Sequence, residues 1–113
     1  MFTCDELFRY HTKDNTLTIE FALTQGTDGW RAYILTPIDY CGRPDSMEAT
    51  SRLYDPTHDL CYVCWNPPPH SLELCEAVAA LWSDLTVAYV YTGEPIFSQY
   101  QRRFYGGLRN DNP

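Results

Sequence analysis

The sequence has few basic side chains, no basic arm and no long apolar run. Eight Lys and Arg residues stand against fifteen Asp and Glu residues, which gives a formal net charge of −7. Direct nucleic-acid binding is therefore disfavoured, because Lys and Arg supply most of the non-specific affinity for phosphates. The first residues contain no basic segment followed by an apolar stretch, and the apolar runs are too short for a membrane span. We therefore expect a cytoplasmic protein with neither a secretory signal nor a membrane segment.

The sequence also lacks the motifs by which common catalytic sites are recognised. It has no Walker loop, no Gly-x-Gly-x-x-Gly after a strand and no His-Glu-x-x-His. The three histidines, His11, His58 and His70, fall in predicted turns or loops, where an exposed polar side chain is the ordinary interpretation. We therefore predict that the protein is not an enzyme and that it needs no cofactor.

Five cysteines without an export signal are typical of reduced thiols. Four residues approach the spacing of a zinc knuckle, but the interval before the histidine is one residue too long: Cys61, Cys64, His70 and Cys75. The first two lie three apart in a predicted strand, where side chains face opposite sides of the sheet. Free cysteines are also often buried in cores. We therefore predict no metal site, and a small zinc protein remains an alternative.

Alternating apolar residues predict a sheet. Leu17, Ile19, Phe21 and Leu23 point one way and the polar residues between them point the other, as in a half-buried strand. Turn signals such as the Gly-Thr-Asp-Gly segment at 26–29 separate this strand from its neighbours. We expect strands near residues 6–11, 16–24, 30–36, 48–54 and 60–65, mostly antiparallel.

A long helix is predicted over residues 72–92. Ser71 suits the N-cap, Gly93 suits the end, and one face is apolar through Leu74, Val78, Leu81, Trp82 and Leu85. The sequence therefore predicts an α+β fold with two layers, in which this C-terminal helix packs on a mostly antiparallel sheet of about five strands. Residues 1–105 would form one domain, in which the segment after residue 95 is either one or two helical turns or a packed extension, and residues 106–113 would form a disordered tail.

Eight residues are candidates for binding a partner or ligand. Trp30 and Trp65 begin and end strands and could be exposed anchors, although packing in the core or at its rim is the alternative. The others come from an irregular loop at 37–46, from the outer side of the helix and from the tail: Asp39, Tyr40, Arg43, Tyr91, Arg102 and Arg103. Together the loop and the tail would form the pocket of a small-ligand or nucleotide-binding protein, which is a second alternative.

Three segments carry a resemblance to other proteins. They are Trp30–Tyr40, Cys61–Trp65 and Ala77–Thr86, and together they resemble short uncharacterised proteins carried by bacterial plasmids, phages and integrative elements. The resemblance implies an accessory protein that binds and blocks host machinery, including antiviral nucleases. With the net charge of −7, we predict a non-enzymatic acidic protein-binding module that inhibits a basic, nucleic-acid-targeting effector.

The outer side of the predicted helix favours self-association. Beyond Asp84 it carries Val87, Ala88, Val90 and Tyr91 and no charged residue up to Thr92. Such an apolar surface needs a cover, which could be the tail at 95–105 or a second copy of the chain. We predict a homodimer.

Overall fold

The alternating apolar residues form the centre of an antiparallel sheet. The computed structural model describes residues 4–104. In strand β2 (Thr18–Gln25), Ile19, Phe21 and Leu23 are fully buried, whereas Thr18 and Glu20 are exposed, which confirms the predicted register. Strands β1 (Glu6–His11) and β3 (Trp30–Ile34) pair with β2 on either side.

A second hairpin completes the sheet. It consists of β4 (Arg52–Asp55) and β5 (Leu60–Val63), and β5 pairs with β3, so that Tyr33 lies directly opposite Tyr62. The strand order is β1-β2-β3-β5-β4, and every neighbouring pair is antiparallel. The predicted α+β fold with a five-stranded antiparallel sheet is confirmed.

The predicted strand at 48–54 is wrong in its first half. Residues Met47–Thr50 form a short helix, α1. The side chain of Ser46 caps it by accepting a hydrogen bond from the backbone N–H of Ala49 (3.2 Å). Ser51 then takes the left-handed conformation (φ 47°), which ends the helix and redirects the chain into β4. The helix cap at Ser46 therefore sets the structure of residues 47–50, although their sequence pattern also suits a strand.

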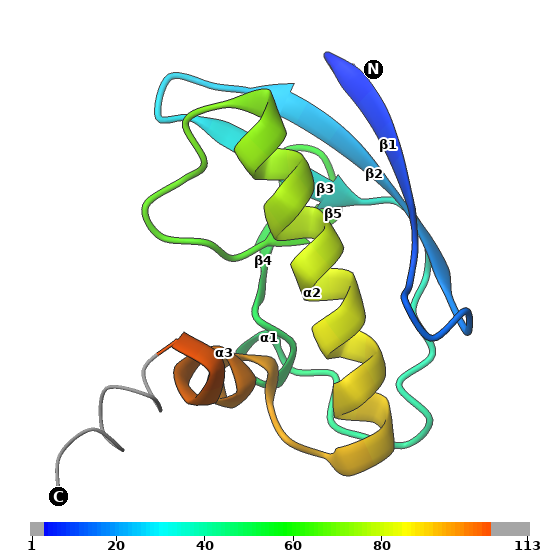
Figure 1. The fold of residues 1–113 in the computed structure, drawn as a ribbon. Helices are drawn as coiled ribbons and strands as arrows, with labels where there is room; N and C mark the ends of the chain where they lie inside the picture. The colour runs from blue at the N-terminus through cyan, green and yellow to red at the C-terminus, as the bar shows by residue number, and fades with distance from the viewer. Residues whose placement is uncertain (1–3, 105–113) are drawn as a thin grey trace, which may run out of the picture.

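Helix α2 (Leu72–Thr92) covers one face of the sheet (Figure 1). The side chain of Ser71 accepts a hydrogen bond from the backbone N–H of Leu74, and Gly93 ends the helix with a positive φ of 80°. Both predicted caps are confirmed. The helix buries Val78, Trp82 and Leu85 as expected, but Leu74 and Leu81 are only half-buried. The remaining buried residues of α2 include small and polar ones: Cys75, Ala79, Ser83, Thr86 and Tyr89.

Helix α2 is long and apolar enough to cross a membrane by length and composition, which the short apolar runs of the sequence did not predict. Half of its most apolar stretch is buried inside the protein. Such burial is typical of the core helix of a soluble protein.

Helix α3 (Ile96–Phe104) follows after a short turn, so of the two alternatives for this segment the structure has the helix. It lies beside α1 and the end of α2 (Figure 1) and buries Ile96, Gln99 and Tyr100. The side-chain amide of Gln99 donates to the backbone carbonyls of Leu85 (3.0 Å) and Glu94 (2.9 Å), which fixes α3 against α2. The predicted disordered tail at 106–113 lies outside the described residues.

Candidate functional site

A groove opens beside the β3–β5 pair, where the segment after β5 leaves the sheet. The two strands pair at Tyr33 and Tyr62, and the segment after β5, Asn66 to Pro69, contains three consecutive prolines that cannot continue a sheet. The resulting hollow, of about 330 Å³, is named here the aromatic groove. Its lining consists of Trp30, Arg31, Leu53, Tyr62, Val63, Cys64, Trp65, Asn66, Pro68 and Pro69.

Contacts with one another and with α3 hold the large side chains of the aromatic groove in place. The guanidinium of Arg31 lies over the ring of Tyr62, 4.4 Å from its centroid. The ring of Trp65 packs edge-on against Tyr100 of α3 at 5.2 Å, and the backbone N–H of Trp30 donates to the carbonyl of Pro69 (2.7 Å). Both tryptophans are therefore half-buried, each with one part packed in the protein and another lining the groove.

Asp55 lies at the centre of a group of polar contacts beside the groove, on the face of the sheet that α2 does not cover. Its Oδ2 accepts hydrogen bonds from the hydroxyl of Tyr33 (2.7 Å) and from Nδ1 of His58 (2.9 Å), and Arg31 Nη1 lies 3.7 Å away. The hydrogen bond from His58, followed by that from Tyr33, holds the pKa of Asp55 well below its usual range. This ionised carboxylate therefore positions Arg31 at the edge of the groove.

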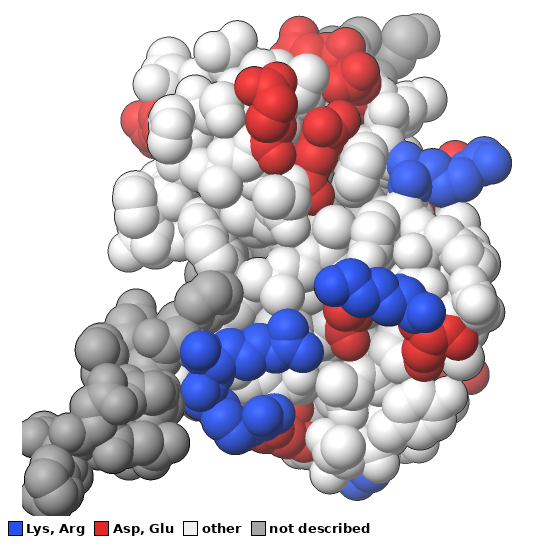
Figure 2. All heavy atoms as spheres, in the orientation of Figure 1, with Lys and Arg blue, Asp and Glu red and all other residues white. Residues whose placement is uncertain are grey.

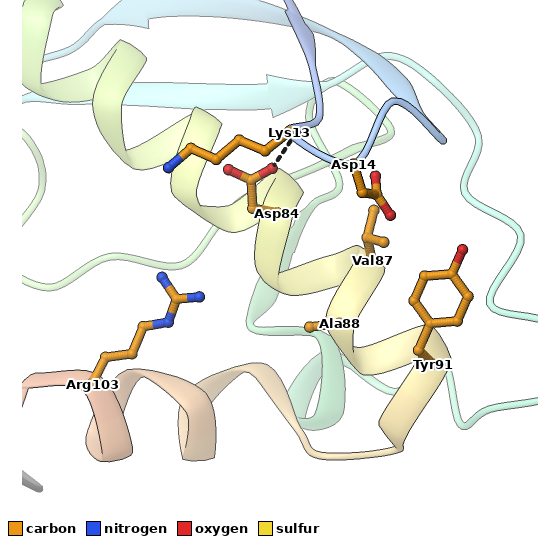
Figure 3. Close-up of a pocket in the computed structure, with 7 residues that line it drawn as sticks. All are labelled: Lys13, Asp14, Asp84, Val87, Ala88, Tyr91 and Arg103. Carbon is orange, nitrogen blue, oxygen red and sulfur yellow. Dashed lines mark hydrogen bonds between the residues drawn. The ribbon is translucent and has the colours of Figure 1, made fainter.

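A second hollow, of about 290 Å³, lies on the outer side of α2 (Figure 3) and is named here the α2 pocket. The turn after β1 contributes Lys13 and Asp14, and α3 contributes Arg103. The remaining lining comes from α2: Asp84, Val87, Ala88 and Tyr91. Asp84 anchors the turn to the helix, because it accepts hydrogen bonds from the hydroxyl of Tyr10 (2.8 Å) and from the backbone N–H of Lys13 (3.0 Å).

The structure brings four of the predicted binding residues together in pairs. Trp30 and Trp65 line the aromatic groove, and Tyr91 and Arg103 line the α2 pocket. The two hollows share no lining residue, so these predicted residues do not form one site. Arg103 lines the α2 pocket together with the turn after β1, and the ligand pocket between the 37–46 loop and the tail stays a prediction.

The other four predicted residues have structural partners. Arg43 donates to the carbonyls of Val90 and Tyr91, both at 3.2 Å, and so satisfies the end of α2. Arg102 forms an ion pair of 2.8 Å with Glu94, and Asp39 Oδ1 accepts a hydrogen bond from the backbone N–H of Cys41 (2.8 Å).

Tyr40 is wrong as a binding residue. Its side chain is only 6% exposed and packs against Tyr89 of α2, with ring centroids 6.1 Å apart. The loop at 37–46 therefore contributes a core side chain. The prolines, the glycine and the aspartates of this segment are typical of an exposed loop, so the sequence did not indicate that Tyr40 is buried.

Several lining residues were not predicted. The sequence could have indicated Arg31 and Tyr62, because the alternation in their strands places them on the same face of the sheet as Tyr33. The sequence gives no indication of Lys13 and Asp84 as lining residues, since they are distant in the sequence and meet only when the turn after β1 packs on α2.

The four residues of the zinc alternative do not assemble. Among residues 4–104, no three His, Cys, Asp or Glu side chains are placed to hold a metal ion together. Cys75 is fully buried, and this burial raises the pKa of its thiol to about 11, which opposes the thiolate that zinc requires. His70, by contrast, is exposed. The residues present therefore do not fit a zinc site.

Comparison with family models, with characterised proteins and with solved structures finds no match to this chain. The resemblance to proteins of mobile elements therefore stays a prediction.

Proposed function

We propose that this protein is a non-enzymatic protein-binding module of the bacterial cytoplasm, and that its partner docks on the aromatic groove. The observation that supports this is the composition of the groove, which combines Trp30, Trp65, Tyr62 and Arg31 in one hollow. Tryptophan, tyrosine and arginine dominate the residues that carry binding energy at protein interfaces.

The groove is also rigid. Arg31 is fixed over Tyr62 and beside Asp55, and Trp65 is fixed against Tyr100. Side chains that are already ordered lose little conformational freedom when a partner binds. The free edge of the groove is apolar, because Leu53 on strand β4 is 43% exposed. A protruding apolar side chain of the partner would fit between Leu53 and the tryptophans.

The charge of the protein favours a basic partner. Figure 2 shows acidic side chains gathered at the end of the molecule where α2 begins (compare Figure 1). The strand ends and the first turns of α2 at this end carry Asp5, Glu6, Asp28, Glu73 and Glu76. Asp28 lines a smaller hollow that shares Arg31 and Pro68 with the aromatic groove, so the acidic end adjoins the docking surface. Such a surface steers a basic protein toward the groove.

Together with the resemblance to proteins of mobile elements, these features favour an inhibitor of a basic, nucleic-acid-targeting effector of the host. The inhibitor would cover the effector's cationic groove with its acidic end and anchor itself through the tryptophans. This function requires no cofactor and no catalytic residue of the inhibitor.

Affinity purification from the bacterium that carries the gene tests the proposal. The full chain, its Leu53→Glu variant and its Leu7→Glu variant are each used as bait. Leu7 is 68% exposed on the same face of the sheet, at the opposite edge, so it matches Leu53 in chemistry but lies outside the groove. We expect the wild type and Leu7→Glu to retain the same basic protein, and Leu53→Glu to lose it.

The binding must also weaken as salt is raised from about 0.05 to 0.5 M, because exposed charges are screened over shorter distances at high ionic strength. Recovery of the same partner by Leu53→Glu, or recovery of no specific protein by the wild type, would contradict the proposal.

A further inference from the structure

Two cations of the described chain have side chains with neither an ion pair nor a hydrogen bond, and both line the α2 pocket. The region 4–104 contains seven Lys and Arg residues. The side chains of five of them contact an acidic residue or a backbone carbonyl: Arg9, Arg31, Arg43, Arg52 and Arg102. Within this part of the chain, the side chains of Lys13 and Arg103 form neither an ion pair nor a hydrogen bond.

The two cations approach the same space from different elements (Figure 3). Lys13 extends from the turn after β1 along the upper rim of the pocket, and Arg103 rises toward it from α3. Two positive groups that face one space repel each other and gain from an anion placed between them. In a protein with a net charge of −7, such an arrangement is not explained by the general surface composition.

Within residues 4–104, neither carboxylate of the pocket forms an ion pair with Lys13 or Arg103, and each accepts hydrogen bonds from other donors of the protein. Both oxygens of Asp84 accept hydrogen bonds, from Tyr10 and from the backbone of Lys13. Asp14 Oδ1 accepts from the hydroxyl and the backbone N–H of Thr16, at 2.7 and 3.1 Å, and from the hydroxyl of Thr12. Hydrogen bonding from Thr16 keeps the pKa of Asp14 below its usual range, so this carboxylate stays ionised. It lies on the side of the pocket away from the charged ends of Lys13 and Arg103 (Figure 3), so an anion between the two cations does not meet it.

The floor of the pocket is apolar. Val87 and Ala88 are half-buried on the outer side of α2, and the ring of Tyr91 stands at the end of the pocket, 66% exposed. A molecule that extends from the two cations across the pocket would therefore contact these methyl groups and, on the far side, the aromatic ring (Figure 3). The volume of about 290 Å³ is that of a site for a small molecule.

We propose that the α2 pocket binds a small organic anion: a carboxylate or phosphate group held between Lys13 and Arg103, on an apolar or aromatic body that lies over Val87 and Ala88 beside Tyr91. This site is separate from the aromatic groove and does not depend on the protein-binding function.

Titration of the ¹⁵N-labelled full chain by NMR tests the proposal. The probes are phenyl phosphate and benzoate, with inorganic phosphate and benzyl alcohol as probes that lack the apolar body or the charge. We expect amide shifts around Lys13, Val87, Ala88 and Arg103 with at least one of the two aromatic anions. That anion identifies the preferred acidic group. Benzyl alcohol and inorganic phosphate should bind at least about fivefold more weakly, because each makes only half of the contacts.

Two pairs of variants identify the site. Arg103→Gln is compared with Arg102→Gln, which removes a neighbouring charge of the same helix that is paired with Glu94. Lys13→Gln is compared with Arg9→Gln, which lowers the net charge equally on strand β1. We expect Arg103→Gln and Lys13→Gln to weaken binding about fivefold or more, and the two controls less than twofold.

The proposal is overturned if neither aromatic anion shifts these amides at millimolar concentration. It is also overturned if the control variants weaken binding as much as Arg103→Gln and Lys13→Gln do, since the effect would then be one of net charge. Equal affinity for inorganic phosphate and phenyl phosphate would overturn the assignment of an apolar body.

Discussion

The indole Nε1 of Trp82 donates a hydrogen bond of 2.8 Å to the backbone carbonyl of Thr50. Both residues are fully buried, and the bond joins the middle of α2 to the end of α1. The indole ring also packs edge-on against Phe21 of β2 at 6.2 Å. Trp82 therefore connects the helix layer, the sheet and the segment that leads into β4.

Replacement of Trp82 should be among the most destabilising single changes in this chain. Trp82→Ala leaves a large cavity and should lower the free energy of unfolding by about 3–5 kcal/mol. Trp82→Phe keeps much of the volume but leaves the Thr50 carbonyl unpaired, which costs about 1–3 kcal/mol. Urea denaturation measures both values. A loss under about 1 kcal/mol for Trp82→Ala would contradict the core role.

Asp55→Asn should make stability less dependent on pH. The pKa of Asp55 is lower in the folded protein than in the unfolded chain, so its contribution is complete above the ordinary carboxyl pKa of about 4 and is lost as the pH falls below it. We expect Asp55→Asn to lower Tm at pH 7 and to have a smaller effect at pH 3. Asp28→Asn, at an exposed turn, is the control for the change in net charge. An equal decrease in Tm at both pH values would rule out this linkage.

Tyr10→Phe should weaken the attachment of the turn after β1 to α2. The change removes the hydrogen bond to Asp84 and should cost about 1 kcal/mol. Burial, with the neighbouring Asp84, raises the pKa of Tyr10 to about 12, so the contribution is complete below pH 10 and is lost as the pH rises toward 12. Thermal unfolding at pH 7 and 11 measures the difference. The matched control is Tyr91→Phe at an exposed ring, which should leave Tm unchanged.

The cysteines should differ widely in reactivity. Cys41 is exposed, whereas Cys75 is fully buried with its thiol pKa raised by burial to about 11. At pH 8, iodoacetamide should therefore modify Cys41 first and Cys75 last, since the thiolate is the reacting form. Mass spectrometry of digested samples over time follows each site, and unfolded protein provides the reference rate. Early labelling of Cys75 in folded protein would contradict its place in the core.

The homodimer remains a prediction. Helix α3 packs beside the end of α2, yet Tyr91 and Phe97 are still 66% and 57% exposed. A second copy could cover these rings through a two-fold interface. Light scattering at micromolar concentration should give twice the chain mass of 13.1 kDa. A mass near that of one chain would contradict the homodimer.

Local patterns in the sequence predict the elements of this fold, but not its hollows. The alternation of Ile19, Phe21 and Leu23 and the capping residues Ser71 and Gly93 act over a few residues, and each produced the expected structure. The capping of α1 by Ser46 was equally local but was hidden by a pattern that suits a strand. The aromatic groove arises where strands β3, β4 and β5 meet the segment Asn66 to Pro69, and the α2 pocket from three elements that meet, so neither follows from local spacing.

The last turns of α2 extend past the sheet (Figure 1), and the residues around them hold the helix through side chains. Tyr89 donates to the carbonyl of Pro44, Arg43 donates to the carbonyl of Val90, and Gln99 donates to that of Leu85. These partners come from a loop and from α3, which open more easily than paired strands. Amide hydrogens of residues 86–92 should therefore exchange with solvent faster than those of residues 75–82. The helix would then behave as two cooperative units, one that unfolds with the sheet and one that opens alone.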